Sequence, residues 1–181
     1  MSPTSLRTFV VYVEDKPGVL NRVASLFRRR LFNIISLNVG RTHEEGVSRM
    51  TIVVEANDDT AHLFEANLYK MVNVLRVQDI TKAPSVTRDL ALIKVAATEE
   101  QRAHLLQICS VFRARALDVA PDSLVIEITG TPDKIDGLVA VLRPFGIVEM
   151  VQTGTVAMTR GTSQAADAVS PISNGKSTLA A

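Results

Sequence analysis

The chain has 181 residues, of which 46% are hydrophobic, enough for one ordinary domain or two small ones with buried cores. A formal net charge of +1 gives no electrostatic basis for binding nucleic acid or an acidic membrane. The only cysteine, Cys109, excludes an intramolecular disulfide and suits a reducing compartment. No apolar run reaches membrane-spanning length, and the first strand begins too early to leave room for a targeting peptide, so we expect a cytoplasmic protein.

The N-terminal part begins with a strand that turns abruptly into a helix. Residues 9–13 are β-branched and aromatic, and apolar residues recur at helical spacing over 20–31. Between them, Pro17 suits a first helical turn and Gly18 lets a ligand approach the backbone closely. The first amides of this helix lack intrahelical partners and carry the positive end of its dipole, so they could hold a carboxylate. An ordinary strand-to-helix turn is the alternative interpretation.

The following elements complete one βαββαβ unit. Residues 33–39 and 50–55 have strand patterns on either side of a polar hairpin loop at 41–46, and 74–77 is a further strand. Residues 57–60 offer N-caps to a second helix. The apolar stripe of that helix is predicted to be Leu63, Phe64, Leu68 and Met71. This order predicts a ferredoxin-like domain, an antiparallel sheet with both helices on one face.

After a linker at 82–85, the same order repeats. Strands are predicted at 90–96, 117–119 and 124–129, with a last strand that begins at 147–150. The predicted helices are 99–115 and 132–145, the second capped by Thr131. We therefore predict an α+β fold in which a ferredoxin-like βαββαβ unit occurs twice, with antiparallel sheets and helices on one face of each.

The C-terminal segment has no hydrophobic period. From Thr159 onward it is rich in Ala, Ser, Thr and Gly, and it cannot bury enough apolar surface to offset the entropy of ordering. We predict a disordered tail at 161–181. The two domains are then 1–82 and 83–160.

The sheet face that the helices leave bare is predicted to be an interface. Val10 and Tyr12 of the first strand and Val53 of a neighbouring strand would be exposed there, and contiguous apolar surface usually marks a partner. The strand at 33–39 is expected at a sheet edge, without proline or lysine to prevent pairing with its own copy. We infer at least a homodimer.

Few side chains could support catalysis or bind a metal. His43, His62 and His104 fall in a loop and on two different helices, without cysteine or carboxylate at zinc-ligand spacing, which favours solvated surface positions. Cys109 lies among apolar helical residues and is interpreted as an inert core thiol. The sequence contains no nucleophile elbow, Walker loop or GxGxxG motif.

The dense basic cluster at 28–30 has two interpretations. Its cations either complement the C-terminal end of a helix dipole or contact a partner protein. RNA is not the expected partner, because an RNA-binding sheet of this topology needs stacking aromatics on its middle strands, and aromatic residues make up only 4% of the chain.

A site for a small zwitterion fits the residues better. Asn33 can offer its amide oxygen to an ammonium group and its amide nitrogen to a carboxylate, and we expect it to face the helix start. Ile34 and Val19 could form the walls of a small aliphatic pocket. Together these residues predict that a branched-chain amino acid is bound and not transformed. In the alternative, Asn33 bonds local backbone at the helix-to-strand corner.

Several motifs in this order resemble a known family. Asp15-Lys16-Pro17-Gly18-Val19-Leu20 after a strand, with Asn33-Ile34 opening the next, resembles the ACT domain, an amino-acid-sensing module. Further motifs at 48–52, 70–75 and 88–95 are similar to those of the small regulatory subunits of acetolactate synthase, also called acetohydroxyacid synthase. The resemblance extends from about Leu6 to Arg160.

The resemblance implies a subunit without catalytic residues, metal or cofactor of its own, which stimulates a separate large catalytic subunit and mediates feedback inhibition by valine. The large subunit would carry thiamine diphosphate, FAD and magnesium. In this family, effector sites form where two N-terminal ACT domains meet. That places Gly18, Val19 and Leu20 at the carboxylate end of the effector and Asn33 and Ile34 on the facing strand. Leucine and isoleucine stay open as effectors.

Two other classes of function compete with this interpretation. A free-standing ACT-type sensor would act on some other partner, and a pull-down without a thiamine-dependent enzyme would favour it. An enzyme in its own right would form acetolactate without any large subunit.

Overall fold

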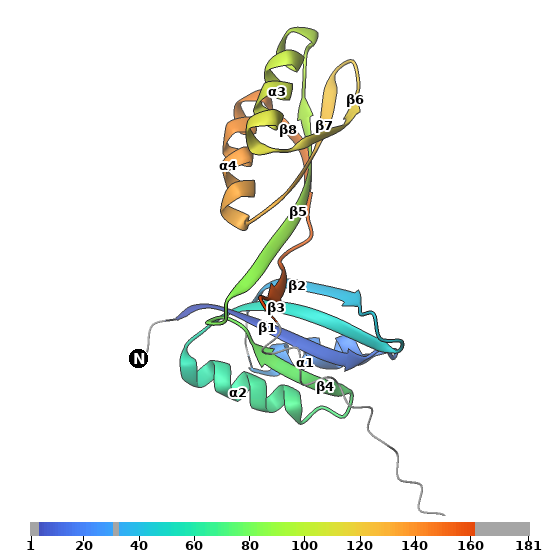
Figure 1. Cartoon of the computed structure of the whole chain (residues 1–181), viewed down its shortest axis with the longest axis vertical. Helices are drawn as coiled ribbons and strands as arrows, with labels where there is room; N and C mark the ends of the chain where they lie inside the picture. Colours follow the sequence, from blue (N-terminus) through green and yellow to red (C-terminus); the bar gives the residue numbers. More distant parts are fainter. Residues whose placement is uncertain (1–3, 31–32, 162–181) are drawn as a thin grey trace, which may run out of the picture.

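Figure 1 shows the computed structural model of the chain, which describes residues 4–30 and 33–161. The N-terminal half contains β1 (Ser5–Glu14), α1 (Val19–Arg30), β2 (Ile34–Arg41), β3 (Val47–Ala56), α2 (Asp58–Tyr69) and β4 (Val74–Asp79). The C-terminal half contains β5 (Ser85–Ala96), α3 (Glu99–Phe112), β6 (Arg115–Val119), β7 (Ser123–Gly130), α4 (Pro132–Leu142), the 3-10 helix η1 (Arg143–Phe145), β8 (Ile147–Gln152) and β9 (Val156–Thr159). The predicted α+β fold, with a βαββαβ order that occurs twice, is confirmed.

The N-terminal sheet has the strand order β2-β3-β1-β4, and α1 and α2 lie against one of its faces (Figure 1). Alternate residues of β1 point to the helices, and Phe9 meets Phe64 of α2 with ring centroids 4.5 Å apart. The predicted stripe of α2 is wrong at Leu63, which is 46% exposed, because the helix turns Ala61 inward instead. β2 lies at the sheet edge, as predicted.

The C-terminal sheet has the order β6-β7-β5-β8 and its own separate core. Its first helix, α3, ends at Phe112 instead of at the predicted residue 115, because Arg113 adopts a left-handed conformation with φ 51°. The predicted helix 132–145 is α-helical only to Leu142, and the chain then tightens into the 3-10 turn η1. Thr131 occupies the N-cap position, but its side chain makes no capping hydrogen bond.

β5 is a strand of 12 residues that belongs to both halves of the molecule (Figure 1). Its later part lies in the C-terminal sheet, whereas Ser85–Arg88 pairs with β9, which the sequence did not predict. Thr159 pairs with Ser85, and the Arg160 amide donates to the carbonyl of Pro84 at 2.7 Å. Of the tail predicted at 161–181, residues 162–181 lie outside the described part of the chain.

The β5–β9 ribbon covers part of the sheet face that the helices leave bare. Val10 and Val53, predicted to be exposed, are only 1% and 7% exposed. Val10 forms a small buried cluster with Ile80 and Ala157, against which Tyr12 and Ala83 pack. The predicted exposed patch is thus wrong at Val10 and Val53, because the chain folds its own C-terminal ribbon over this face.

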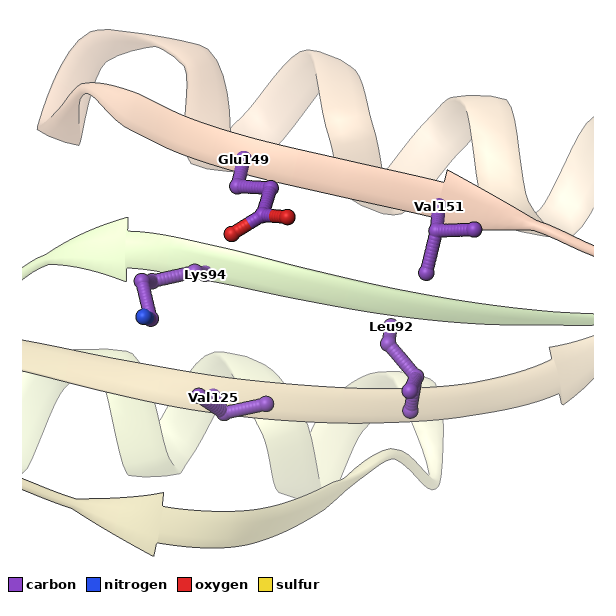
Figure 2. Close-up of a pocket in the computed structure, with 5 residues that line it drawn as sticks. All are labelled: Leu92, Lys94, Val125, Glu149 and Val151. Atoms are coloured by element: carbon purple, nitrogen blue, oxygen red, sulfur yellow. The ribbon is translucent and has the colours of Figure 1, made fainter.

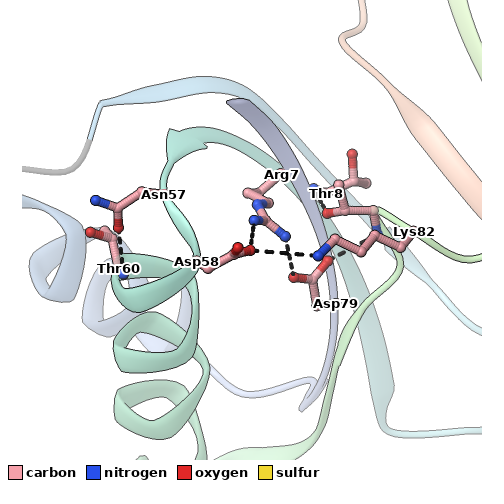
Figure 3. Close-up of polar contacts among 8 residues, drawn as sticks. Arg7, Thr8, Asn57, Asp58, Thr60, Asp79 and Lys82 are labelled. Carbon is pink, nitrogen blue, oxygen red and sulfur yellow. Dashed lines mark hydrogen bonds and ion pairs between the residues drawn. The ribbon is translucent and has the colours of Figure 1, made fainter. Parts of the chain in front are cut away.

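Arg7 of β1 is a charged residue in a buried position, only 7% exposed (Figure 3). Its guanidinium forms an ion pair with Asp58, the first residue of α2, and lies 3.7 Å from the carboxylate of Asp79 at the end of β4. Lys82, in the linker, lies 3.7 Å from the same Asp58 carboxylate. The hydrogen bond and charge of Arg7 hold the pKa of the Asp58 carboxyl below its ordinary value. The network ties the sheet, α2 and the interdomain linker together.

We predict that Asp58→Asn lowers the melting temperature at pH 7. The pKa of Asp58 is lower in the folded protein, so its stabilising contribution is present above the ordinary value of about 3.9 and is lost as the pH falls through the lowered folded value. Thermal melts from pH 7 to pH 3 should show the difference between variant and wild type shrinking in acid. Asp59→Asn, on the same exposed helical turn, is the matched control, and an equal effect of both changes would contradict the assignment.

We also predict that removing residues 161–181 leaves the melting temperature unchanged, because this stretch has no apolar period with which to dock. A chain cut after Thr153 should instead lose about 2 kcal/mol or more of unfolding free energy, since Val10 and Ile80 lose their cover. Denaturant unfolding and binding of a hydrophobic dye distinguish the two truncations. Equal unfolding free energies of the two truncated proteins would show that the β5–β9 ribbon does not stabilise the N-terminal domain.

Candidate functional site

The β1–α1 turn is held in a shape that leaves its backbone accessible. The Asp15 amide donates to the carbonyl of Gly46 at 2.7 Å, and the Lys16 amide donates to that of Glu14 at 2.9 Å. Gly18 has φ +83°, in the left-handed region that glycine tolerates at no steric cost. A Cβ placed on Gly18 would meet no atom within 4 Å, so the space in front of this glycine is open. A ligand can therefore approach the backbone here.

The start of α1 is suited to an anion. Its first turn contains no acidic residue. Among the described residues, the amides of Gly18 and Leu20 have no hydrogen-bond partner, and that of Val19 makes only a long bond of 3.4 Å to Lys16. Unpaired amides and the helix dipole both favour a negative group at this end of α1.

The side chains of the turn divide between core and surface. Val19, 3% exposed, belongs to the hydrophobic core, so in this chain it does not form the predicted pocket wall. Leu20, 45% exposed, is the aliphatic side chain that the turn presents to solvent.

Two further residues brace the turn from outside it. The Asn73 side chain donates to the Glu14 carboxylate at 2.5 Å and accepts from the Arg22 guanidinium at 2.7 Å. Hydrogen bonds from Asn73 and then from Lys16 hold the pKa of the Glu14 carboxyl below its ordinary value. Sequence reasoning missed this brace. Arg22 could have been found as a cation near the start of α1, but Asn73 lies beside the turn only because β1 and β4 are neighbours in the folded sheet.

The second half of the predicted site lies at the start of β2. Asn33 is exposed immediately before the strand, and Ile34 is half-buried against the N-terminal core. Ile34 pairs with Val54 of β3, and the register of β2 then shifts before Ser36.

In one chain, the two halves of the site are far apart. β1 and β2 both run antiparallel to β3, so they are parallel to each other, and α1 crosses from the end of one to the start of the other. Val54 pairs with Ile34 on one side and with Arg7 on the other. From Arg7 to Glu14, β1 is about 23 Å long at about 3.3 Å per residue. Gly18 and Asn33 therefore lie at opposite ends of the sheet, and only a second chain could bring equivalent residues together.

The equivalent helix start in the C-terminal half is closed. Thr98 accepts from the Gln101 amide at 3.3 Å, and the Gln101 side chain accepts from the Thr98 amide at 3.2 Å. This capping box satisfies the amide of Thr98, which precedes the helix as Gly18 precedes α1, and the amide of Gln101. Glu99 and Glu100 in the same turn would repel an anion. Of the two copies, only the first has a helix start suited to a carboxylate.

The C-terminal sheet carries a shallow hollow of about 210 Å³ on the face away from its helices (Figure 2). Leu92, Val125 and Val151 form an aliphatic surface, and Lys94 and Glu149 lie on neighbouring strands beside it. The hollow is lined by one charge of each sign and by no serine, threonine, cysteine or histidine.

No described residues form a metal or thiol centre. Within residues 4–30 and 33–161, no three or more His, Cys, Asp or Glu side chains are grouped so that they could hold a metal ion. Cys109 is buried, and burial raises the pKa of its thiol, as the interpretation of a core thiol requires. None of the helices in this part of the chain is long and apolar enough to span a membrane.

Comparison with known proteins gives concordant matches along the chain. A family model described as an AHAS small subunit-like ACT domain matches residues 9–76, and one described as the small subunit of acetolactate synthase matches residues 88–161. The chain is 48% identical over 158 residues to the acetolactate synthase small subunit of Mycolicibacterium smegmatis, covering 87% of this chain and 93% of that protein. A probable acetolactate synthase small subunit of Archaeoglobus fulgidus is 48% identical over 154 residues, covering 85% and 96%.

A solved structure gives the same result for the fold. The crystal structure of the acetolactate synthase small subunit from Thermotoga maritima superposes with a TM-score of 0.81 at 36% identity, covering 87% of this chain and 98% of that one. Both halves are thus matched in sequence and in structure, and the chain belongs to the family of acetolactate synthase small subunits.

Proposed function

We propose that the chain is a cytoplasmic regulatory subunit that stimulates the catalytic large subunit of acetolactate synthase and makes it sensitive to feedback inhibition by valine. The observation that supports this most directly is the open start of α1 at Gly18, a carboxylate site without catalytic side chains in a chain of this family. The large subunit would supply thiamine diphosphate, FAD and magnesium, and this chain would bind none of them.

The proposed effector site is completed by a second copy. Within the described part of the chain, β2 is hydrogen-bonded to a strand on one side only, to β3. If two β2 edges pair antiparallel, the start of each lies beside the end of the other. That arrangement brings Asn33 and Ile34 of one protomer to the end of the sheet that carries the Gly18 turn of its partner. The homodimer then encloses two equivalent sites.

Each part of a valine molecule has a complementary group in this arrangement. The amides from Gly18 to Leu20 would hold the carboxylate, and the oxygen of the Asn33 side chain would accept from the ammonium group. Leu20 and Ile34 offer aliphatic surface to the side chain. Leucine and isoleucine fit the same chemistry and are to be compared with valine by titration.

The regulatory role predicts that this protein alone forms no acetolactate but raises the turnover of a large subunit. The physical reason is that the start of α1 offers binding amides, and that the described residues contain no group of three or more His, Cys, Asp or Glu that could hold a metal ion. Acetolactate production should be measured for each subunit alone and for the mixture. An unchanged rate on mixing would exclude the role of activator, and product formed by this chain alone would establish an enzyme.

The proposed site predicts that Asn33→Ala desensitises the complex to valine but leaves stimulation in place. Losing a hydrogen bond to a charged group costs about 1.5–3 kcal/mol, which lowers valine affinity about 10- to 100-fold. Folding should change little, because Asn33 is exposed before an edge strand. Valine titrations and thermal melts on the same samples provide the measurement.

Asn67→Ala is the matched control for this substitution. Asn67 is another asparagine of the N-terminal domain, half-buried on α2, and its side chain donates to the carbonyl of Leu63. The control should keep the wild-type valine response. If Asn33→Ala lowers the melting temperature and the valine response stays intact, Asn33 bonds local backbone and the effector site lies elsewhere.

A further inference from the structure

The segment between β8 and β9 leaves the C-terminal sheet and contacts the edge strand β2 of the N-terminal sheet. The Thr155 amide donates to the Ser36 hydroxyl at 2.8 Å, and the Asn38 side chain lies 3.5 Å from the Thr153 carbonyl. Beyond it, the Arg49 guanidinium donates to the carbonyl of Ala157 in β9. We name residues 153–157 the strap.

The strap packs directly onto β2 at a glycine. Gly154 has φ +78°, and a Cβ added to it would lie 2.4 Å from the Ser36 hydroxyl oxygen and 3.4 Å from its Cβ. A side chain at position 154 would displace the Ser36 hydroxyl, whereas the nearest backbone atom, the Leu37 amide nitrogen, lies at 3.9 Å. Ser36 and Gly154 are thus in close contact, and a Cβ at position 154 would disturb the hydroxyl that accepts from the Thr155 amide.

On its other side, the strap is fastened to the C-terminal sheet. The Thr153 amide donates to the Leu90 carbonyl at 3.0 Å, and the Thr153 hydroxyl accepts from the Leu90 amide at 3.1 Å. Leu90 lies in β5, which pairs with both β7 and β8. A displacement of the strap thus also displaces Leu90 of β5, to which Thr153 is hydrogen-bonded.

The domains are otherwise loosely joined around the strap. Each has its own core, and the buried cluster that the ribbon forms with the N-terminal sheet contains only Val10, Ile80 and Ala157. Beside the strap is a cavity of about 410 Å³ that residues of both domains line. The lining includes Ile35, Ser36 and Val53 on one side and Asp89, Pro132 and Gln152 on the other. The domains can therefore change orientation without disturbing either core.

We propose that the contact of Ser36 with Gly154 and Thr155 couples effector binding to the orientation of the C-terminal domain. This inference rests on the function proposed above, in which Asn33 and Ile34 contact valine. β2 shifts register between Ile34 and Ser36, so a small change at the effector is passed along the strand to Ser36. Effector-bound β2 holds the strap more firmly, and the strap fixes the C-terminal domain in the arrangement that inhibits the large subunit.

Gly154→Ala tests the proposal against a matched control, Gly161→Ala. Both glycines have positive φ, +78° and +75°, so alanine has a similar backbone cost at each, but a Cβ on Gly161 meets no atom within 4 Å. Ser36→Ala is a milder second variant that removes only the acceptor for the Thr155 amide. Each full-length protein is assayed for valine binding by calorimetry, for stimulation of the large subunit and for valine inhibition.

Because the coupling between two binding equilibria is reciprocal, we expect Gly154→Ala and Ser36→Ala to stimulate the large subunit like wild type, but to bind valine more weakly and to need about fivefold or more valine for half-inhibition. Gly161→Ala should behave like wild type. Hydrogen exchange provides a readout without the large subunit, since valine should slow exchange of the Thr155 amide in wild type and not in Ser36→Ala.

Two results would overturn the proposal, and they are distinguishable. If wild type does not bind valine, the proposed function fails and the coupling fails with it. Suppose instead that wild type binds valine and confers inhibition. If both strap variants then show the same valine titration as wild type, and valine does not change the hydrogen exchange of the Thr155 amide, only the proposed coupling is wrong. Melting temperatures of the variants show whether a changed response comes from unfolding instead.

Discussion

The direction in which α1 crosses the N-terminal sheet is the constraint on which the rest of this molecule depends. A helix that joins two parallel strands of one sheet must begin at the end of the first and finish at the start of the second, and its right-handed path is set by strand twist. The anion-binding end of α1 and the polar start of β2 are thereby held apart. In the function that we propose, a ligand that needs both recruits a second chain, so occupancy of the proposed site and pairing of the β2 edges are linked by mass action. Edge pairing is, in that proposal, part of ligand recognition as well as of assembly.

Much of the fold followed from local patterns whose physical cause is simple. Pro17 and Gly18 separate a strand period from a helical one, and the Asn57 side chain caps α2 by accepting from the Thr60 amide at 2.8 Å, as its residue type predicts. Where prediction failed, tertiary structure decided. Arg113 ends α3 in a left-handed conformation. Glycine or asparagine at this position would have predicted such an ending, but arginine rarely adopts this conformation.

The cover of the bare sheet face could not be predicted, because apolar residues on a strand indicate burial without identifying what buries them. Val10 and Val53 were correctly recognised as apolar on the face without helices, but a strand as short as β9 has too few residues to show a period. The one sequence feature that could have indicated a turn before β9 was Gly154 between two threonines. Its contact with Ser36 is visible only in the folded structure. The candidate site has the same limit, since a sequence shows that Gly18 and Asn33 suit one ligand but not whether one chain or two must supply them.

The duplicated scaffold is used for two different tasks, and a few residues at each helix start account for the difference. In the first copy, glycine and the lack of acidic residues leave the amides at the start of α1 open to an anion. In the second, the capping box of Thr98 and Gln101 satisfies two amides internally, and Glu99 and Glu100 add negative charge to the first turn, so α3 gains a stable end that disfavours an anion. The second copy instead extends β5 and adds β9, which carry it onto the bare face of the first. In the function that we propose, the first copy keeps a site that a ligand can fill, and the second keeps a contact that responds when the site is filled.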